Sequence, residues 1–175
     1  MKHKASDRPS IPLSELGPGF KTEVMRHKEA KGLNACFSCG TCTAGCPVHE
    51  IFSEYSPLKL AKMIKLGLRK EVLSSPFIWY CVTCHNCEHR CPQNVKFFNI
   101  LTVLKNMAAK EGYSPAPWVE QTQQIMQTGM IFPKRGKWEK RRQALGLREI
   151  KADGTKAKRL IKLTSIDKIK SRIES

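Results

Sequence analysis

Apolar residues recur along this chain at the three- and four-residue spacing of α-helices, and no segment shows the sustained alternation of a strand. Residues 56–67 carry the strongest helix signals. Ser56 can cap the first turn, Pro57 suits the first helical position, and Gly67 is typical of a helix end. We therefore predict a helix over this segment and a mainly α-helical protein.

Further segments show the same pattern and punctuation. In residues 96–110 the apolar residues share one face, and Gly112 follows the last turn. Ser75 and Pro76 repeat the start signal just before the second cysteine motif described below. The other predicted helices are residues 20–31, 117–128 and 137–145, the last two followed by Gly129 and Gly146. We expect almost no strand.

Composition divides the chain into three parts. Residues 1–19 contain several prolines and glycines without a sustained period, which predicts an extended N-terminal arm. Residues 20–148 hold the predicted helices and all the cysteines, which predicts one helical domain. Residues 149–175 form a basic C-terminal tail in which lysines and arginines interleave with leucines and isoleucines. Because its apolar period is weak, we expect this tail to be disordered alone and to order by docking on a partner.

The formal net charge is +16, with 31 Lys and Arg against 15 Asp and Glu. Such a charge raises nucleic acid or an anionic membrane surface as partners. Its distribution argues against that reading, because residues 134–175 hold 15 of the basic residues and only 5 of the acidic ones. We expect no nucleic-acid partner, and we expect the charge to attract redox partners.

Cysteine usage is the feature that defines the chemistry. The eight cysteines form one motif that occurs twice, 45 residues apart. The copies are Cys36-x-x-Cys39-x-x-Cys42-x-x-x-Cys46-Pro47 and Cys81-x-x-Cys84-x-x-Cys87-x-x-x-Cys91-Pro92. This is the spacing of bacterial ferredoxins, in which three thiolates hold one 4Fe-4S cluster and the fourth cysteine, before proline, binds the other cluster. The motif therefore predicts two 4Fe-4S clusters.

By that rule the ligand sets cross between the motifs. The first cluster takes Cys36, Cys39, Cys42 and Cys91, and the second takes Cys46, Cys81, Cys84 and Cys87. The alternative is structural zinc, which also binds paired C-x-x-C elements, although zinc sites usually join two such pairs across a dozen or more residues. Three histidines lie close to the motifs, and with both quartets complete we expect polar contacts from them: His49, His85 and His89.

No motif for substrate chemistry accompanies the cysteines. The chain lacks a dinucleotide-binding glycine pattern, a phosphate-binding loop and a nucleophile elbow, so we identify no catalytic residue and expect outer-sphere electron transfer. The first residues lack the apolar core of a signal peptide, and no apolar run reaches the length of a membrane span. We therefore expect a cytoplasmic protein without an integral membrane segment.

The cysteine motifs and the residues around them resemble the C subunit of heterodisulfide reductase. The resemblance is carried by Cys36-Phe-Ser-Cys39-Gly-Thr-Cys42-Thr-Ala-Gly-Cys46-Pro47, Trp79-Tyr80-Cys81-Val-Thr-Cys84 and Arg90-Cys91-Pro92. It continues through Gly112-Tyr-Ser-Pro115, Thr128-Gly129 and Arg142-Gln-Ala-Leu-Gly146-Leu147, and so covers roughly residues 20–148. The chain departs from the family at His85-Asn86, at Glu88-His89 and in the tail after Ile150.

This resemblance implies an all-helical dicluster fold and a place in a hetero-oligomeric redox complex. In this family the C subunit relays electrons between two partners. One is the A subunit, which contains flavin and iron-sulfur clusters and is called the flavin subunit below, and the other is the catalytic B subunit. In methanogens that complex reduces the heterodisulfide of coenzymes M and B, and related bacterial complexes act on other sulfur substrates. Two alternatives remain: an iron-sulfur subunit of a fumarate reductase-like or quinone-linked enzyme, and a zinc-stabilised nucleic-acid-binding module.

Overall fold

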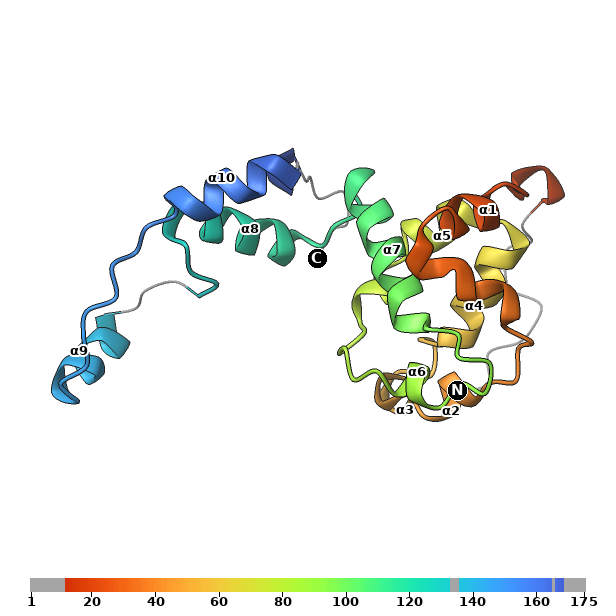
Figure 1. The fold of residues 1–175 in the computed structure, drawn as a ribbon, viewed down its shortest axis with the longest axis horizontal. Helices are drawn as coiled ribbons and strands as arrows, with labels where there is room; N and C mark the ends of the chain where they lie inside the picture. The colour runs from red at the N-terminus through yellow and green to blue at the C-terminus, as the bar shows by residue number, and fades with distance from the viewer. Residues whose placement is uncertain (1–11, 133–135, 165, 169–175) are drawn as a thin grey trace. The chain divides into compact units, whose positions relative to one another are not determined.

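The computed structural model describes residues 12–132, 136–164 and 166–168, and these residues form helices and loops without a β-strand (Figure 1). The mainly α-helical fold class is therefore confirmed. The α-helices are α1 (Phe20–Met25), α2 (Thr41–Ala44), α3 (Pro47–Ile51), α4 (Pro57–Leu66), α5 (Arg69–Leu73), α6 (Asn86–His89), α7 (Phe97–Lys110), α8 (Ala116–Thr128), α9 (Gly136–Ala144) and α10 (Thr155–Thr164). Short 3-10 helices are η2 (Leu13–Glu15), η3 (Lys28–Ala35), η4 (Pro76–Trp79) and η5 (Ile166–Lys168).

The chain separates into two compact units, Met1–Met107 and Ala108–Ser175, and each is described by itself. The sequence-based division at residues 19 and 148 stays a prediction. None of the described helices is long and apolar enough to span a bilayer.

Helices α1, α4, α5 and α7 enclose the core of the first unit (Figure 1). Ile64 of α4 and Ile100 and Leu104 of α7 are fully buried, as are side chains of the neighbouring elements. Those neighbouring core residues are Phe20, Val24, Leu33, Val72, Leu73 and Ile78. The short helices that carry the cysteine motifs, α2, α3 and α6, lie together at one end of this unit (Figure 1). A packed helical layer therefore supports the cysteine loops.

The strongest predicted helix forms as expected. Ser56 accepts a hydrogen bond from the backbone N–H of Lys59 at 3.1 Å, which satisfies one of the unpaired donors of the first turn of α4. Gly67 ends the helix with φ +82°, a left-handed conformation that glycine adopts without steric cost. Its carbonyl accepts a 2.9 Å hydrogen bond from the N–H of Gly17, so the end of α4 holds the segment that leads into α1.

The predicted helix over residues 20–31 was only partly right. Helix α1 ends at Met25, and His27 has an extended backbone with ψ 124° before η3 begins. Gly32, inside η3, lies close to the backbone of Val95, and a Cβ there would be 3.6 Å from the Val95 Cα. This ordinary van der Waals contact joins η3 to the segment before α7, a long-range pairing that the local pattern does not contain. Helices α7, α8 and α9 confirm the other predictions within a residue or two.

The second unit contains a result that the sequence did not predict. Part of the basic tail is helical, because α10 occupies Thr155–Thr164 and packs against α8. Asp153 caps its start by accepting a 2.9 Å hydrogen bond from the N–H of Thr155. Gly154 is buried against the last turn of α8, where a Cβ would come within 2.6 Å of the carbonyl carbon of Gln127. The expectation of a disordered tail was therefore wrong for α10, and residues 169–175 lie outside the described residues.

Candidate metal centre

The two cysteine motifs follow the same backbone path. Ser38 and Thr83, one residue before the second cysteine of each motif, both have positive φ, at 66° and 56°. Gly40 and His85, one residue after it, also have positive φ, at 85° and 61°. Each pair is followed by a four-residue helix, α2 or α6. The repeat in sequence is therefore a repeat in conformation, and it presents the cysteines of both motifs in the same way.

His85 occupies a position where the first motif has glycine. A left-handed conformation costs a non-glycine residue roughly 1–2 kcal/mol, so contacts elsewhere must offset it. The His85 ring packs on Phe98 of α7 with centroids 4.1 Å apart, and its Nδ1 lies 3.2 Å from Oε2 of Glu88. These contacts agree with a polar and packing role for this histidine. His49 also has a polar contact, through Nδ1 to the Tyr55 carbonyl at 2.7 Å.

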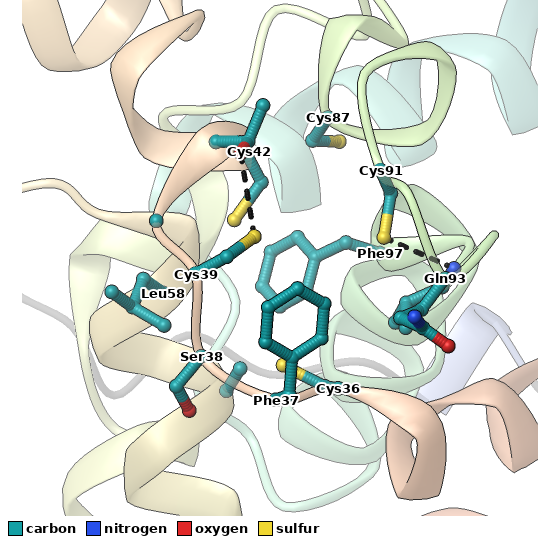
Figure 2. A pocket seen from close by; sticks show the side chains of 14 residues that line it. Cys36, Phe37, Ser38, Cys39, Cys42, Leu58, Cys87, Cys91, Gln93 and Phe97 are labelled. Atoms are coloured by element: carbon teal, nitrogen blue, oxygen red, sulfur yellow. Dashed lines mark hydrogen bonds between the residues drawn. The ribbon is translucent and has the colours of Figure 1, made fainter.

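One pocket gathers the thiols predicted for the first cluster. Cys36, Cys39 and Cys42 line it from the first motif, and Cys91 lines it from the end of the second (Figure 2). Cys87 lies at the same pocket. The apolar part of the wall is made by Phe37, Leu58, Ala61, Val95 and Phe97. The fold thus brings Cys91 beside three cysteines that precede it by 49 residues or more.

Hydrogen-bond donors approach the sulfur atoms of this pocket. The N–H of Val95 donates to Cys91 Sγ at 3.3 Å, and Thr41 Oγ1 lies 3.3 Å from Cys39 Sγ. The Thr41 contacts lower the pKa of the exposed Cys39 thiol, whereas burial raises the pKa of Cys42. Donors directed at sulfur stabilise thiolate charge, and apolar walls limit water around it.

Tyr55 lies near thiols predicted to bind the second cluster. Tyr55 is only 2% exposed, and its pKa is raised, chiefly by burial. The charges of Cys81 and Cys46 raise the pKa further, and smaller contributions come from hydrogen bonding to the Cys81 side chain and from the charge of Cys87. Burial, Cys81 and Glu88 raise the pKa of Cys87 to about 12, with smaller effects from Cys42 and Cys84. Cys46 from the first motif therefore lies near the same buried hydroxyl as Cys81 and Cys87.

The two motifs meet at equivalent positions. Gly45 and Arg90 each precede the last cysteine of a motif, and the Arg90 side chain lies on Gly45, where a Cβ would come 2.5 Å from Nη1. Asn86 Nδ2 donates to the Gly45 carbonyl at 3.3 Å. On the other side, Thr43 Oγ1 accepts from the N–H of Leu58 at 3.0 Å, which ties α2 to α4. Because Gly45 has no side chain, Arg90 and Asn86 of the second motif can approach its backbone closely.

Two lysines reach the motifs from the supporting helices. Lys65 of α4 donates from Nζ to the carbonyl of Cys36. Lys105 of α7 is half-buried with Nζ 5.8 Å from the centre of the Trp79 ring, and it interacts with the charge of Cys81. Sequence reasoning missed both lysines and Tyr55. A weak signal existed for Lys105, since it follows the core residue Leu104 and so lies at the edge of the buried face of α7.

Comparison with known proteins identifies the group that these thiols hold. Residues 32–95 match the family model of the 4Fe-4S dicluster domain. The chain is 30% identical to the iron-sulfur C subunit of the CoB–CoM heterodisulfide reductase of Methanopyrus kandleri, over 89% of this chain and 88% of that protein. The chain belongs to the family of heterodisulfide reductase C subunits. Another relative is the C2 subunit of the H2/formate:CoB–CoM heterodisulfide,ferredoxin reductase of Methanococcus maripaludis, at 33% identity over 77% of this chain and 76% of the relative.

Membership of this family confirms the resemblance and the prediction of two 4Fe-4S clusters, and it argues against the zinc alternative. The chain carries two 4Fe-4S clusters. The residues present fit this group, because eight thiols, none of them in a disulfide, supply four ligands for each cluster. Sulfur-directed donors and apolar walls suit an anionic iron-sulfur cluster better than a hydrated ion. The chain is thus an iron-sulfur, electron-transferring member of the heterodisulfide reductase C-subunit family.

Proposed function

We propose that this chain relays electrons between the flavin subunit, which also holds iron-sulfur clusters, and the catalytic B subunit of a heterodisulfide reductase-like complex. The observation that carries the proposal is that all eight cysteines are free of disulfides and belong to two complete four-cysteine motifs. The second cysteine of each motif, Cys39 or Cys84, is exposed at the surface. A cluster with four thiolate ligands has no open position for a substrate, so its chemistry is outer-sphere electron transfer. The substrate reaction then belongs to another protein of the complex. A cytoplasmic location stays a prediction.

We further propose crossed ligation, with Cys91 completing the first cluster and Cys46 the second. The shared pocket of Cys91 with Cys36, Cys39 and Cys42 supports the first assignment. The position of Tyr55 near Cys46, Cys81 and Cys87 supports the second. Crossing would link the two motifs covalently through the clusters, so that loss of either cluster would also loosen the junction at Gly45 and Arg90.

The protein's own residues have a defined part in the relay. Bound clusters supply the one-electron chemistry. The donors at Val95 and Thr41 would stabilise the added negative charge at the first site, and Tyr55 and Lys105 would do so at the second. Lys105 lies on α7 itself, while Tyr55 lies just before α4 and Val95 just before α7, so these two core helices position the segments that carry the three groups.

The relay role is tested by comparing the purified chain with the assembled complex. The chain loaded anaerobically should exchange electrons with viologen dyes and show no heterodisulfide reductase turnover, while addition of the flavin and catalytic subunits from the same organism should produce turnover. Turnover by the chain alone would contradict the relay role, as would full turnover by the two partners without it.

Crossed ligation is tested with four cysteine variants. Cys39→Ala must affect the first cluster and Cys84→Ala the second under either ligation pattern, so their electron paramagnetic resonance spectra identify the two sites. We expect Cys91→Ala to match Cys39→Ala and Cys46→Ala to match Cys84→Ala. The opposite pairing would show that each motif keeps its own fourth ligand.

A further inference from the structure

An exposed apolar surface is formed by residues that neighbour, in the chain, two of the cysteines proposed for the second cluster. Its members are Pro47, Val48 and Ile51 of α3, Phe52 directly after that helix, and Tyr80 and Val82 on either side of Cys81; we call this surface the α3 face. These residues line one shallow hollow in the first unit. The α3 face therefore combines residues in or beside both motifs, which the fold brings together.

Most of the α3 face is open to solvent. Ile51 is 76% exposed, Val82 61% and Phe52 55%. Isolated exposed apolar residues are ordinary, but contiguous ones that line a hollow mark an interaction site in soluble proteins. The aromatic part is preformed, since the rings of Phe52 and Phe77 lie 5.8 Å and 5.6 Å from the ring of Tyr80. A partner would thus meet a surface that needs little ordering on binding.

The α3 face is placed where a partner could exchange electrons with the second cluster. Tyr80 and Val82 adjoin Cys81 in the chain, and Pro47 follows Cys46, so the face is built from the immediate neighbours of two proposed ligands of the second cluster. A protein bound here would exclude water from that cluster and could bring its own redox centre close to it. The rate of electron transfer falls steeply with the distance between two redox centres. A relay therefore needs a protein contact beside each cluster that exchanges electrons with a partner.

Charge at the rim indicates what kind of surface fits. Glu50 precedes Ile51, Glu54 follows Phe52 by two residues, and both are exposed in a chain whose net charge is +16. An apolar centre with a charged rim is the usual arrangement of a protein interface. A second copy of this chain would bring the same glutamates face to face in a symmetric contact, which is unfavourable. A partner with Lys or Arg around an apolar patch complements both features.

We propose that the α3 face is the docking surface through which the second cluster exchanges electrons with one of the two partners, and that this partner presents an apolar patch rimmed by basic residues over its own redox centre. This proposal rests on the relay function proposed above. It adds the surface of the chain that binds one of the two partners and the cluster that exchanges electrons there.

The test uses the full, cluster-loaded chain and the purified flavin and catalytic subunits from the same organism. Ile51→Glu combined with Phe52→Ser removes the centre of the α3 face without touching a cysteine or a buried residue. Leu13→Glu is the matched control, because Leu13 is 83% exposed and η2, in dark red, lies at the opposite end of the first unit from α3 (Figure 1). Binding to each of the two subunits is measured by calorimetry, and electron transfer by stopped-flow absorbance.

We expect the double variant to keep both cluster spectra, to bind one of the two subunits at least tenfold more weakly, and to lose electron transfer to that partner only. Leu13→Glu should match the wild-type chain. Glu50→Lys with Glu54→Lys should also weaken binding to the same partner.

Three outcomes would overturn the proposal. If the wild-type chain binds either partner and the double variant binds both as tightly, the α3 face is not the docking surface while the relay function stands. If the wild-type chain binds neither partner, the relay function fails together with the proposal. If light scattering shows a dimer of this chain that the double variant dissolves, the face joins two copies instead.

Discussion

Removal of one hydroxyl group, by Tyr55→Phe, should lower the reduction potential of the second cluster. The phenol is buried, and burial, the charges of Cys81 and Cys46 and hydrogen bonding to the Cys81 side chain raise its pKa, so we infer that it donates to that sulfur. A donor to a ligand sulfur stabilises the reduced, more negative cluster. A hydrogen bond to a charged group contributes about 1.5–3 kcal/mol. Reduction takes a cluster with four thiolates from a formal charge of about −2 to about −3, so this hydrogen bond should strengthen by roughly half.

Half of the lower figure is about 0.7 kcal/mol, and for a one-electron couple about 59 mV corresponds to about 1.4 kcal/mol. Tyr55→Phe should therefore lower the potential of the second cluster by roughly 30 mV. The aromatic ring remains, so the packing should be kept. The measurement is an electron paramagnetic resonance redox titration, with the same substitution repeated in the Cys39→Ala background to assign the shift to a site.

Tyr113→Phe is the control, because it removes a tyrosine hydroxyl in the second unit. It should leave both potentials unchanged. An unchanged second cluster in Tyr55→Phe, or an equal shift of both clusters, would refute the assignment of this hydroxyl to the second site.

Three further substitutions test other parts of the site and its support. Lys105→Met should lower the potential of the second cluster, since it removes a half-buried positive charge near Cys81, and Lys105→Arg should restore most of it in the same titration. Gly67→Ala should destabilise the loaded protein by about 2 kcal/mol or more, because φ is +82° and the new Cβ meets the backbone of Gly17. Gly19→Ala is the control and should be close to neutral, because there is open space around its Cβ. Both are measured by thermal unfolding followed by circular dichroism. Leu104→Ala, at a fully buried position, should cost about 2–5 kcal/mol in the same unfolding assay. Near-wild-type behaviour of Lys105→Met, Gly67→Ala or Leu104→Ala would contradict the corresponding reason.

The helices that the sequence predicted well are those whose signals are local. Ser56 and Gly67 bound α4, and Gly129 bounds α8 with φ +70°, because capping and left-handed glycine act within a few residues of a helix end. The break at His27 and the 3-10 path of η3 had no such local signal, and Gly32 in η3 contacts Val95, more than sixty residues away in the chain. Helix α10 also had local signals, because its apolar residues recur at helical spacing and Asp153 caps its first turn, and the expectation of a disordered tail overlooked them. Its packing on α8, with the close contact at Gly154, is the part that the local sequence does not contain.

The same distinction applies to the candidate site. Cysteine spacing predicts the clusters because the ligands belong to two short, identical motifs, and the matching positive φ angles at Ser38 and Thr83 show how each motif encodes its own conformation. Tyr55 and Lys105 belong to neither motif. They reach the second site because α3, α4 and α7 place the loop before α4 and one edge of α7 beside Cys81, so no spacing rule includes them. The motif therefore determines which cofactor is bound, while the helices around it supply the groups that make one cluster electrostatically different from the other. A protein that kept both motifs but lost Tyr55 and Lys105 would still bind two clusters, with a lower potential at the second.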